Sequence, residues 1–453
     1  MNGNGGSPIK EPDDGVRQEI WSWGAGTDGQ LATGRGSLQD EHTPQLIRSL
    51  SAFGRVTSLA CGGAHAVALL SGGRVLAWGR GSSGQLGHGE MADCSQPTEV
   101  KALEGFEITC VSAGWNHSAF VSESGNLFTC GDGSFGQLGH GDYSSQCSPL
   151  EVSYFSSKPV NQVACGMRHS LVLLRENQVY GFGSGKRGQL GISSEKIKSS
   201  NYPQIALGIT SLRITKVRAN GEHSAALSDD GRLYTWGRGF GGASDECIPQ
   251  CYDVAISLKD VALGWNHALL LTSEGQVFML GGNRHGVLSE PQKTPQTSEA
   301  SGRSTLVKMR VIPELMELKV LQIAAGAEHS AVVTDNDTIM TWGWGEHGQL
   351  GLGDTKDETS PKVVSLPHQF PDTNRRPISR VYCGSGFSFV LRTYGMHWAM
   401  ARTLNYSRGF VLQRLKTRML TSFRMIVELP VHLFAVSYRV LNRSHVTMRR
   451  LFS

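Results

Sequence analysis

The chain has 453 residues, of which 39% are hydrophobic and 18% are charged, and its formal net charge is +4. This length is sufficient for a large buried core, and the 56 glycines favour many short strands joined by tight turns over a bundle of long helices. The nine cysteines contain no Cys-x-x-Cys pair, which argues against a zinc site and against a disulfide framework. We therefore expect a reducing compartment, namely the cytoplasm, the nucleus or both.

Residues 1–17 are polar, contain no apolar signal region and are too acidic for a transit peptide, so the sequence predicts a disordered leader. From residue 18 onward, a pair formed by an aromatic or other apolar residue and a glycine recurs. Its first members are Trp23, Trp78, Cys130, Phe182, Trp236, Leu280 and Trp342. Successive pairs are 55, 52, 52, 54, 44 and 62 residues apart, and such a period predicts a repeat architecture.

Five of these pairs open the spacing Gly-x-Gly-x-x-Gly, which begins at Gly24, Gly79, Gly131, Gly183 and Gly343. A single occurrence would indicate a dinucleotide-binding loop, which requires a following helix whose N-terminus holds the pyrophosphate. In this sequence four of the five loops continue into Gln-Leu-Gly and then into polar turn residues, without an amphipathic helix. We therefore expect no nucleotide cofactor.

The repeat that contains residues 108–157 can be divided into four short strands, at 108–113, 117–122, 126–130 and 149–154. Residues 123–126, between the second and third strands, have the composition of a hairpin turn. Four strands in each of seven repeats predict an all-β protein, a seven-bladed β-propeller.

A second motif, Gly-x-x-His, precedes each aromatic-Gly pair from Trp78 onward. Its histidines are His65, His117, His169, His223, His267 and His329, and the seventh copy has Phe387 instead. Since each His occupies the same position in a different repeat, we expect a ring of loop-holding hydrogen bonds and not a metal site. The residue three before each of these positions is Gly six times and Asn220 once, which predicts a left-handed backbone there.

Two segments interrupt the repeats, at 289–303 and 192–202, and each is interpreted either as a tolerated surface loop or as a contact with a partner. The repeat marks end near residue 394. Residues 395–453 contain ten Lys or Arg against one acid, Glu428, which gives a net charge of +9. This tail is either a basic module for a membrane surface or nucleic acid, or not an evolved module. The apolar stretch 425–436 is too short for a transmembrane segment.

The marks W-G-x-G-x-x-G-Q-L-G-x-G and G-x-x-H-[ST] closely resemble the regulator-of-chromosome-condensation repeat family over residues 18–394. The resemblance implies a seven-bladed propeller whose last blade is closed by the N-terminal strand. Residues 19–24 would supply that strand, and 378–392 would supply two further strands of the same blade.

The founding member of this family is a guanine-nucleotide exchange factor for a small nuclear GTPase, so the resemblance implies exchange activity on a small GTPase. Its working face includes an acid and a His near the Gly-x-x-His loops. The matching candidate catalytic residues in this chain are Glu222, His223, Glu328 and His329. The sequence thus predicts a protein-interaction module, and guanine-nucleotide exchange on a small GTPase is the most specific activity that we assign to it.

Two alternatives are kept open. The chain could be a non-catalytic adaptor or scaffold, associated with chromatin or a membrane through its basic tail. It also resembles UV-B-receptor-like members of the family, which stack tryptophans from neighbouring loops. Only Trp115 and Trp265 occupy that position in this chain, three repeats apart, so the sequence predicts no coupled pair. We assign Trp115, Asn116, Arg168, Trp265 and Asn266 to a binding face.

Overall fold

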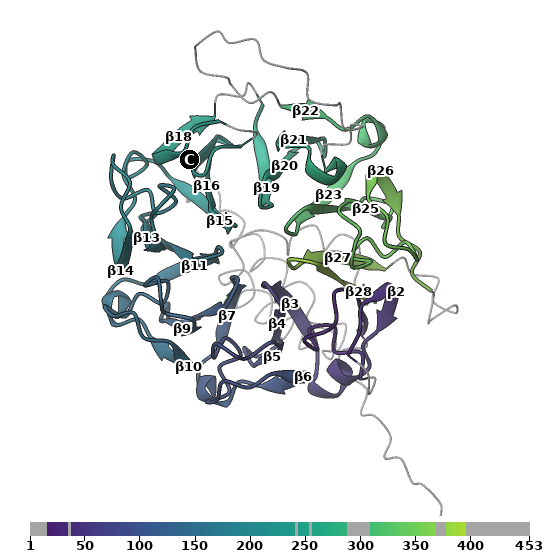
Figure 1. Ribbon diagram of the computed structural model, residues 1–453, viewed down its shortest axis with the longest axis horizontal. Helices are drawn as coiled ribbons and strands as arrows, with labels where there is room; N and C mark the ends of the chain where they lie inside the picture. Colours follow the sequence, from purple (N-terminus) through teal and green to yellow (C-terminus); the bar gives the residue numbers. More distant parts are fainter. Residues whose placement is uncertain are drawn as a thin grey trace, which may run out of the picture. The chain divides into compact units, whose positions relative to one another are not determined.

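The computed structural model describes residues 16–34, 38–240, 243–252, 256–287, 309–367 and 377–395. These residues form seven four-stranded antiparallel sheets, arranged as blades around a central axis (Figure 1). The all-β, seven-bladed propeller predicted from the repeats is therefore confirmed. In this part of the chain, no helix is long and apolar enough to cross a bilayer. The predictions for 289–303, for most of the leader and for the tail beyond 395 fall outside the described residues.

The strands of each blade are given from the innermost to the outermost. Blade 1 consists of β3 (Val56–Cys61), β4 (His65–Leu70), β5 (Val75–Gly79) and β6 (Cys94–Glu99), and blade 2 of β7 (Ile108–Ala113), β8 (His117–Ser122), β9 (Leu127–Gly131) and β10 (Gln146–Glu151). Blade 3 consists of β11 (Val160–Cys165), β12 (His169–Leu174), β13 (Val179–Ser184) and β14 (Ser199–Ile205). Blade 4 consists of β15 (Ile214–Asn220), β16 (His223–Ser228), β17 (Leu233–Gly237) and β18 (Glu246–Tyr252). Blade 5 consists of β19 (Leu258–Leu263), β20 (His267–Thr272), β21 (Val277–Gly281) and β22 (Arg310–Val311). Blade 6 consists of β23 (Val320–Ala325), β24 (His329–Thr334), β25 (Ile339–Gly343) and β26 (Glu358–Val363). Blade 7 consists of β27 (Ile378–Cys383), β28 (Phe387–Tyr394), β1 (Arg17–Gly24) and β2 (Glu41–Leu46).

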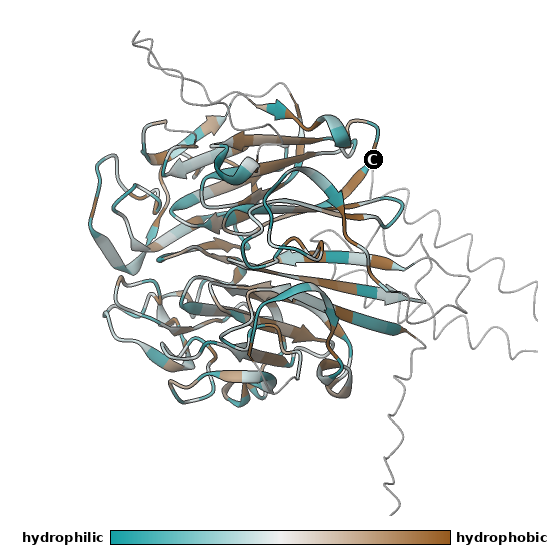
Figure 2. Ribbon diagram, turned by 45° about the vertical axis from the view of Figure 1, so that its right-hand side comes forward, coloured by the Kyte–Doolittle hydropathy of each residue, from teal (hydrophilic) through white to brown (hydrophobic). Residues whose placement is uncertain are grey.

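The second strand of each blade is mostly or wholly buried, as in β4 and β8. This burial explains its almost continuous apolar sequence, because both faces of the sheet pack against neighbouring blades. The described core accordingly consists of seven clusters, one in each interface between blades. Figure 2 shows hydrophobic residues along the strands and hydrophilic residues in many of the connecting loops.

Blade 7 joins the two ends of the propeller. β1 pairs with β28 over eight residues, from Arg17 opposite Tyr394 to Gly24 opposite Phe387. The Glu19 carboxylate is buried in this junction and accepts hydrogen bonds from the Trp21 indole, at 3.2 Å, and the Tyr394 hydroxyl, at 3.0 Å. The N-terminal strand thus closes the ring, as the sequence resemblance implied.

The six repeated histidines link each blade to the next. Their rings are buried, and five of them contact a serine hydroxyl of the following blade through Nε2, at 2.8 to 3.0 Å. In the first of these links, His65 contacts Ser118, whose hydroxyl donates to the Gln85 carbonyl at 2.7 Å. Because the hydroxyl proton is used in that bond, His Nε2 must carry the donated hydrogen. The prediction of structural hydrogen-bonding histidines is therefore confirmed.

The Gln-Leu-Gly motif supplies the other side of this link. The side-chain carbonyl of Gln85 accepts a hydrogen bond from the backbone N–H of Ser83 at 2.9 Å and so holds its own loop. The backbone carbonyl of Gln85 accepts the hydrogen bond from the Ser118 hydroxyl of the next blade. At two other interfaces the backbone carbonyl of the equivalent glutamine accepts an indole N–H. Gln30 accepts it from Trp78, and Gln189 accepts it from Trp236. The aromatic-Gly, Gln-Leu-Gly and His-Ser marks are therefore parts of one interface between blades.

Two interfaces depart from this pattern. Between blades 7 and 1, Phe387 takes the position of the His, and Ala66 takes the position of the Ser, within one buried cluster. Between blades 4 and 5 the serine is replaced by Ala268, and His223 instead contacts the carbonyl oxygen of Trp265 at 2.6 Å. The first exception exchanges both polar partners together, which leaves no buried hydroxyl without its histidine.

The predicted left-handed backbone before each His is wrong. The glycines three residues before the ring have no positive φ, whereas the glycines after the aromatic mark do, as at Gly79 with a φ of 102°. The reason for glycine is steric: a Cβ on Gly62 would lie 2.5 Å from Cε1 of His65 and would collide with the carbonyl oxygen of Gly114. Close packing of the ring, and not backbone conformation, therefore requires glycine at this position.

We expect the natural Phe387–Ala66 pair to be transferable to another interface. His117→Phe should destabilise the protein by about 2 kcal/mol, because the Ser170 hydroxyl loses its donor and the ring is replaced by a larger one. The double variant His117→Phe/Ser170→Ala should recover at least half of that loss. Denaturant unfolding of the wild type, both single variants and the double variant measures the coupling. Strictly additive effects would contradict this interpretation of the pair.

The same histidines should make the fold sensitive to acid. Burial lowers their pKa from 6.5 to about 3 or 4. Between pH 6.5 and 4 the unfolded chain therefore binds protons that the folded chain does not bind, so stability is highest above pH 6.5 and falls as pH falls. At pH 5 each ring should cost roughly 2 kcal/mol. Unfolding free energies measured from pH 8 to 5 test this, and a constant value over that range would contradict it.

Candidate functional site: the loop face of the propeller

The loops between the first and second strands of each blade lie on the same face as the long loops between its third and fourth strands. The backbone joins the two sets, as in the hydrogen bond from Asp132 N–H to the Asn116 carbonyl at 2.8 Å. The Gly-x-x-His and glycine-rich segments therefore form one surface, which we call the loop face. All the candidate residues predicted from the sequence belong to these loops or to the strand residue that directly follows them.

A belt of backbone hydrogen bonds surrounds the axis on the loop face. The N–H groups donate to the loop of a neighbouring blade in six pairs: Gly63 to Gly114, Trp115 to Gly166, Met167 to Gly221, Trp265 to Ala327, Ala327 to Ser385 and Ser385 to Gly62, at 2.8 to 3.2 Å. Between blades 4 and 5, side chains make the link instead. Asn220 Nδ2 donates to the Leu263 carbonyl at 2.6 Å, beside the contact from His223 to Trp265. The loops are thus held in place before any partner arrives.

Trp115 and Trp265 meet across the mouth of the central channel. They come from blades 2 and 5, and their ring centroids are 5.2 Å apart at an interplanar angle of 49°. Both side chains are half-buried. The prediction that these residues form no neighbouring pair is therefore wrong, because loops three repeats apart in sequence lie across a narrow axis from each other. The contact leaves an aromatic surface at the centre of the loop face.

The two candidate carboxylates differ in accessibility. The Glu222 side chain is 26% exposed and lies 3.6 Å from Arg187. The Glu328 side chain is only 8% exposed, because Asn266, Arg284 and His285 contact its carboxylate at 2.9, 3.5 and 3.2 Å. Of the two, Glu222 is the one that a partner could reach without displacing neighbouring side chains.

The adjacent histidines, His223 and His329, lie below this surface and are at most 1% exposed. His223 stacks on Phe240, with ring centroids 4.2 Å apart, and His329 contacts Ser388. Their burial keeps them out of direct contact with a partner, so their part in any activity is to hold the loops that carry the glutamates.

The other predicted binding residues lie around the aromatic pair. The Arg168 guanidinium is exposed and lies over the Phe135 ring, 4.7 Å from its centroid. Asn116 and Asn266 follow the two tryptophans and are half-buried, and the Asn266 side chain donates to Glu328. The five predicted binding residues therefore share the loop face, although Arg168 belongs to a different blade from either tryptophan.

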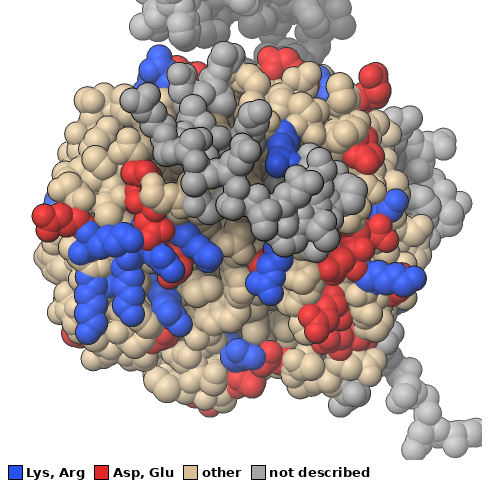
Figure 3. Space-filling model, turned by 45° about the horizontal axis from the view of Figure 1, so that its top comes forward, with Lys and Arg blue, Asp and Glu red and all other residues tan. Residues whose placement is uncertain are grey.

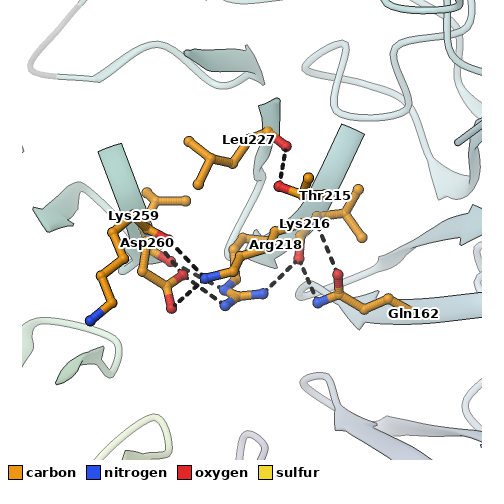
Figure 4. Close-up of polar contacts among 9 residues, drawn as sticks. Gln162, Thr215, Lys216, Arg218, Leu227, Lys259 and Asp260 are labelled. Atoms are coloured by element: carbon orange, nitrogen blue, oxygen red, sulfur yellow. Dashed lines mark hydrogen bonds and ion pairs between the residues drawn. The ribbon is translucent and has the colours of Figure 1, made fainter. Parts of the chain in front are cut away.

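A cavity of about 340 Å³ occupies the channel beneath the tryptophans. Its wall includes an ionic cluster that sequence reasoning missed, in which Asp260 lies 3.0 Å from Lys216 and 2.8 Å from Arg218 (Figure 4). Burial alone would raise the pKa of Asp260, but the two cations lower it overall. Alignment of the seven inner strands could have revealed the cluster, since the position of Lys216 and Asp260 holds Gln in β11 and β23.

A second aromatic group on the loop face was also missed. Trp344 lies 5.8 Å from the His285 ring and 5.1 Å from the His347 ring, measured between centroids. The sequence signal was a tryptophan in the variable position of W-G-x-G, where no other repeat has one.

This geometry defines a class of protein, a seven-bladed β-propeller whose loop face is held by hydrogen bonds between neighbouring blades. Among the described residues, no group of three or more His, Cys, Asp or Glu side chains could hold a metal ion. The chain belongs to the RCC1-like domain family, whose model matches residues 19–390.

Several relatives match most of the chain. The ultraviolet-B receptor UVR8 of Arabidopsis thaliana is 33% identical over 368 residues, which cover 78% of this chain and 79% of the relative. The secretion-regulating guanine nucleotide exchange factor of Mus musculus is 28% identical and covers 82% and 83%. Among solved structures, Prp20p of Saccharomyces cerevisiae has a TM-score of 0.71 at 22% identity and covers 86% and 94%. Human WBSCR16 has a TM-score of 0.68 at 24% identity and covers 83% and 99%. These two structures support the fold alone.

Proposed function

We propose that this protein is a protein-binding platform whose loop face engages a small GTPase and accelerates release of its bound nucleotide. The observation that carries the proposal is the aromatic pair Trp115–Trp265 at the axis, on the same face as the partly exposed carboxylate of Glu222. Large aromatic side chains at the centre of a surface are the residues that most often dominate protein association. The belt around them limits the entropy lost on binding.

Exchange on a GTPase requires no covalent chemistry from the propeller. A bound guanine nucleotide is held mainly by its phosphates, by a magnesium ion and by a phosphate-binding lysine. A carboxylate pressed against that region repels the phosphates and competes for the lysine, so nucleotide affinity falls. Glu222 is suited to this role because the backbone of its loop is fixed and its side chain remains partly exposed.

One of the relatives supports a partner of this kind. The mouse relative, which matches most of this chain, bears the name of a guanine nucleotide exchange factor. A non-catalytic adaptor remains a second candidate, and the enclosure of Glu328 by three neighbouring side chains favours it. An adaptor would use the same tryptophans without lowering nucleotide affinity.

We expect the 453-residue chain to accelerate release of a fluorescent GDP analogue from at least one member of a panel of small GTPases. Glu222→Ala should reduce the acceleration at least tenfold, about 1.4 kcal/mol in transition-state stabilisation, while GTPase binding persists. Trp265→Ala should weaken binding itself, by about 2 kcal/mol. The matched control is Glu90→Ala, an exposed glutamate on a glycine-rich loop of blade 1.

The outcomes separate the two candidates. Binding to a GTPase without accelerated release would contradict exchange and favour the adaptor. Failure to bind any GTPase would contradict a GTPase partner altogether. Equal loss of activity in Glu222→Ala and Glu90→Ala would remove the assignment of Glu222.

A light-sensing function is a third candidate, favoured by one observation: the contact between Trp115 and Trp265 that the structure contains. If the pair senses UV-B, irradiation of the purified protein should change its oligomeric state, and Trp265→Phe should abolish the change. Trp344→Phe serves as the control, since this indole lies on the same face but contacts histidines. Light scattering after irradiation measures the mass, and an unchanged mass in the wild type would exclude this candidate.

A further inference from the structure

The glycine-rich loop of blade 3 differs in charge from its counterparts. Residues 185–198 contain four Lys or Arg, at 186, 187, 196 and 198, against Glu195, a net charge of +3. The four other loops that share the Gly-x-Gly-x-x-Gly spacing are all acidic. Their net charges are −1 for 26–40 (one Arg, two Asp), −2 for 81–93 (one Glu, one Asp), −1 for 133–145 (one Asp) and −2 for 345–357 (one Lys, one Glu, two Asp). Because the loops share one frame, this reversal is a property of the surface and not of the fold.

The structure gathers these cations together. The Gly185 N–H donates to the Lys198 carbonyl at 3.1 Å, so both ends of the loop lie side by side. Arg187 and Lys196 both contact the Asp245 carboxylate, at 3.3 and 2.5 Å. Arg168 adjoins the same loop, because its carbonyl accepts the Ser184 N–H at 2.7 Å. We call Arg168, Lys186, Arg187, Lys196 and Lys198 the basic surface, and a gathering of Lys and Arg of this kind is visible in Figure 3.

The acidic groups nearby are Asp245, Glu195 and Glu222, of which Glu222 lies 3.6 Å from Arg187, and together with the five cations they leave a net charge of +2. Asp245 is only 10% exposed and lies beneath Arg187 and Lys196, which remain about half exposed, at 47% and 53%. Burial would raise the pKa of Asp245, but Lys196 and Arg187 lower it overall. Lys186, Lys198 and Arg168 are exposed, and the structure gives them no carboxylate partner within the described residues. Positive charge therefore remains available to a ligand.

We infer that the basic surface docks a short acidic segment of a protein partner. The inference deepens the proposed function and rests on it in one respect, namely that the partner is a protein that also contacts the loop face. Complementary charge chiefly raises the association rate and fixes orientation, so the basic surface would guide the partner toward the tryptophans.

The neighbouring loops argue against a nucleic acid or a membrane as the occupant. Duplex DNA carries about one negative charge per 1.7 Å of its axis, so it would extend beyond blade 3 over the acidic loops of blades 1 and 2. A flat anionic membrane would likewise face the acidic loops of blades 6 and 7. Only a segment short enough to stay on the basic surface avoids this repulsion.

The test uses fluorescence anisotropy to measure binding of a short labelled peptide rich in Asp and Glu to the 453-residue chain. We expect binding that weakens as salt rises, and at least tenfold weaker binding in Lys186→Glu/Lys198→Glu. The matched control is Lys356→Glu/Lys362→Glu, which changes the net charge equally at exposed lysines of blade 6 and should change affinity less than twofold. Thermal unfolding checks that both variants fold.

Three results would overturn the inference: no binding of the peptide, equal loss in both double variants, or tighter binding of duplex DNA or phosphatidylserine vesicles than of the peptide. The peptide assay contains no GTPase, so a failure of exchange leaves its result unchanged. If a GTPase does bind, Lys186→Glu/Lys198→Glu should slow its association and reduce the salt dependence, while nucleotide release at saturation stays as in the wild type.

Discussion

Five of the seven interfaces between blades depend on a hydrogen bond from a buried, neutral histidine to a serine hydroxyl of the next blade. The His65–Ser118 bond illustrates it, with Ser118 also donating to the Gln85 carbonyl. Buried hydroxyls and imidazoles are costly unless each has a partner, so these links specify how neighbouring blades meet. The Phe387–Ala66 interface supports this view, since there both polar groups are absent together.

This constraint positions the loop face. Each His stands at the first residue of a second strand, directly after the loop that carries the candidate side chains, so fixing the ring also fixes the loop. Between blades 4 and 5 the His223 bond ends on the Trp265 carbonyl, and the backbone belt is replaced there by Asn220. One of the two interfaces that depart from the repeat is therefore the one that holds half of the aromatic pair.

Much of the fold could be predicted because every repeat records the same local requirements. The strands at 108–113 and 117–122 were located to the residue, and the third and fourth strands of that repeat were displaced by one and three residues. The site was less accessible to prediction. Contact between Trp115 and Trp265 depends on the diameter of the ring, and the enclosure of Glu328 depends on side chains from three other positions. Neither distance across the axis nor burial is encoded in a motif.

The repeats also separate what is structural from what is free to vary. The glycines and Gln-Leu-Gly recur because each contact between blades needs them, so they carry little information about a partner. Information lies where equivalent positions differ. Trp115 and Trp265 occupy a position that holds Gly, Ala, Ser or Met in the other blades, and the loop at 185–198 has the opposite charge from its counterparts. Both departures lie on the same face, so the frame that makes the blades equivalent also displays the residues that make them different.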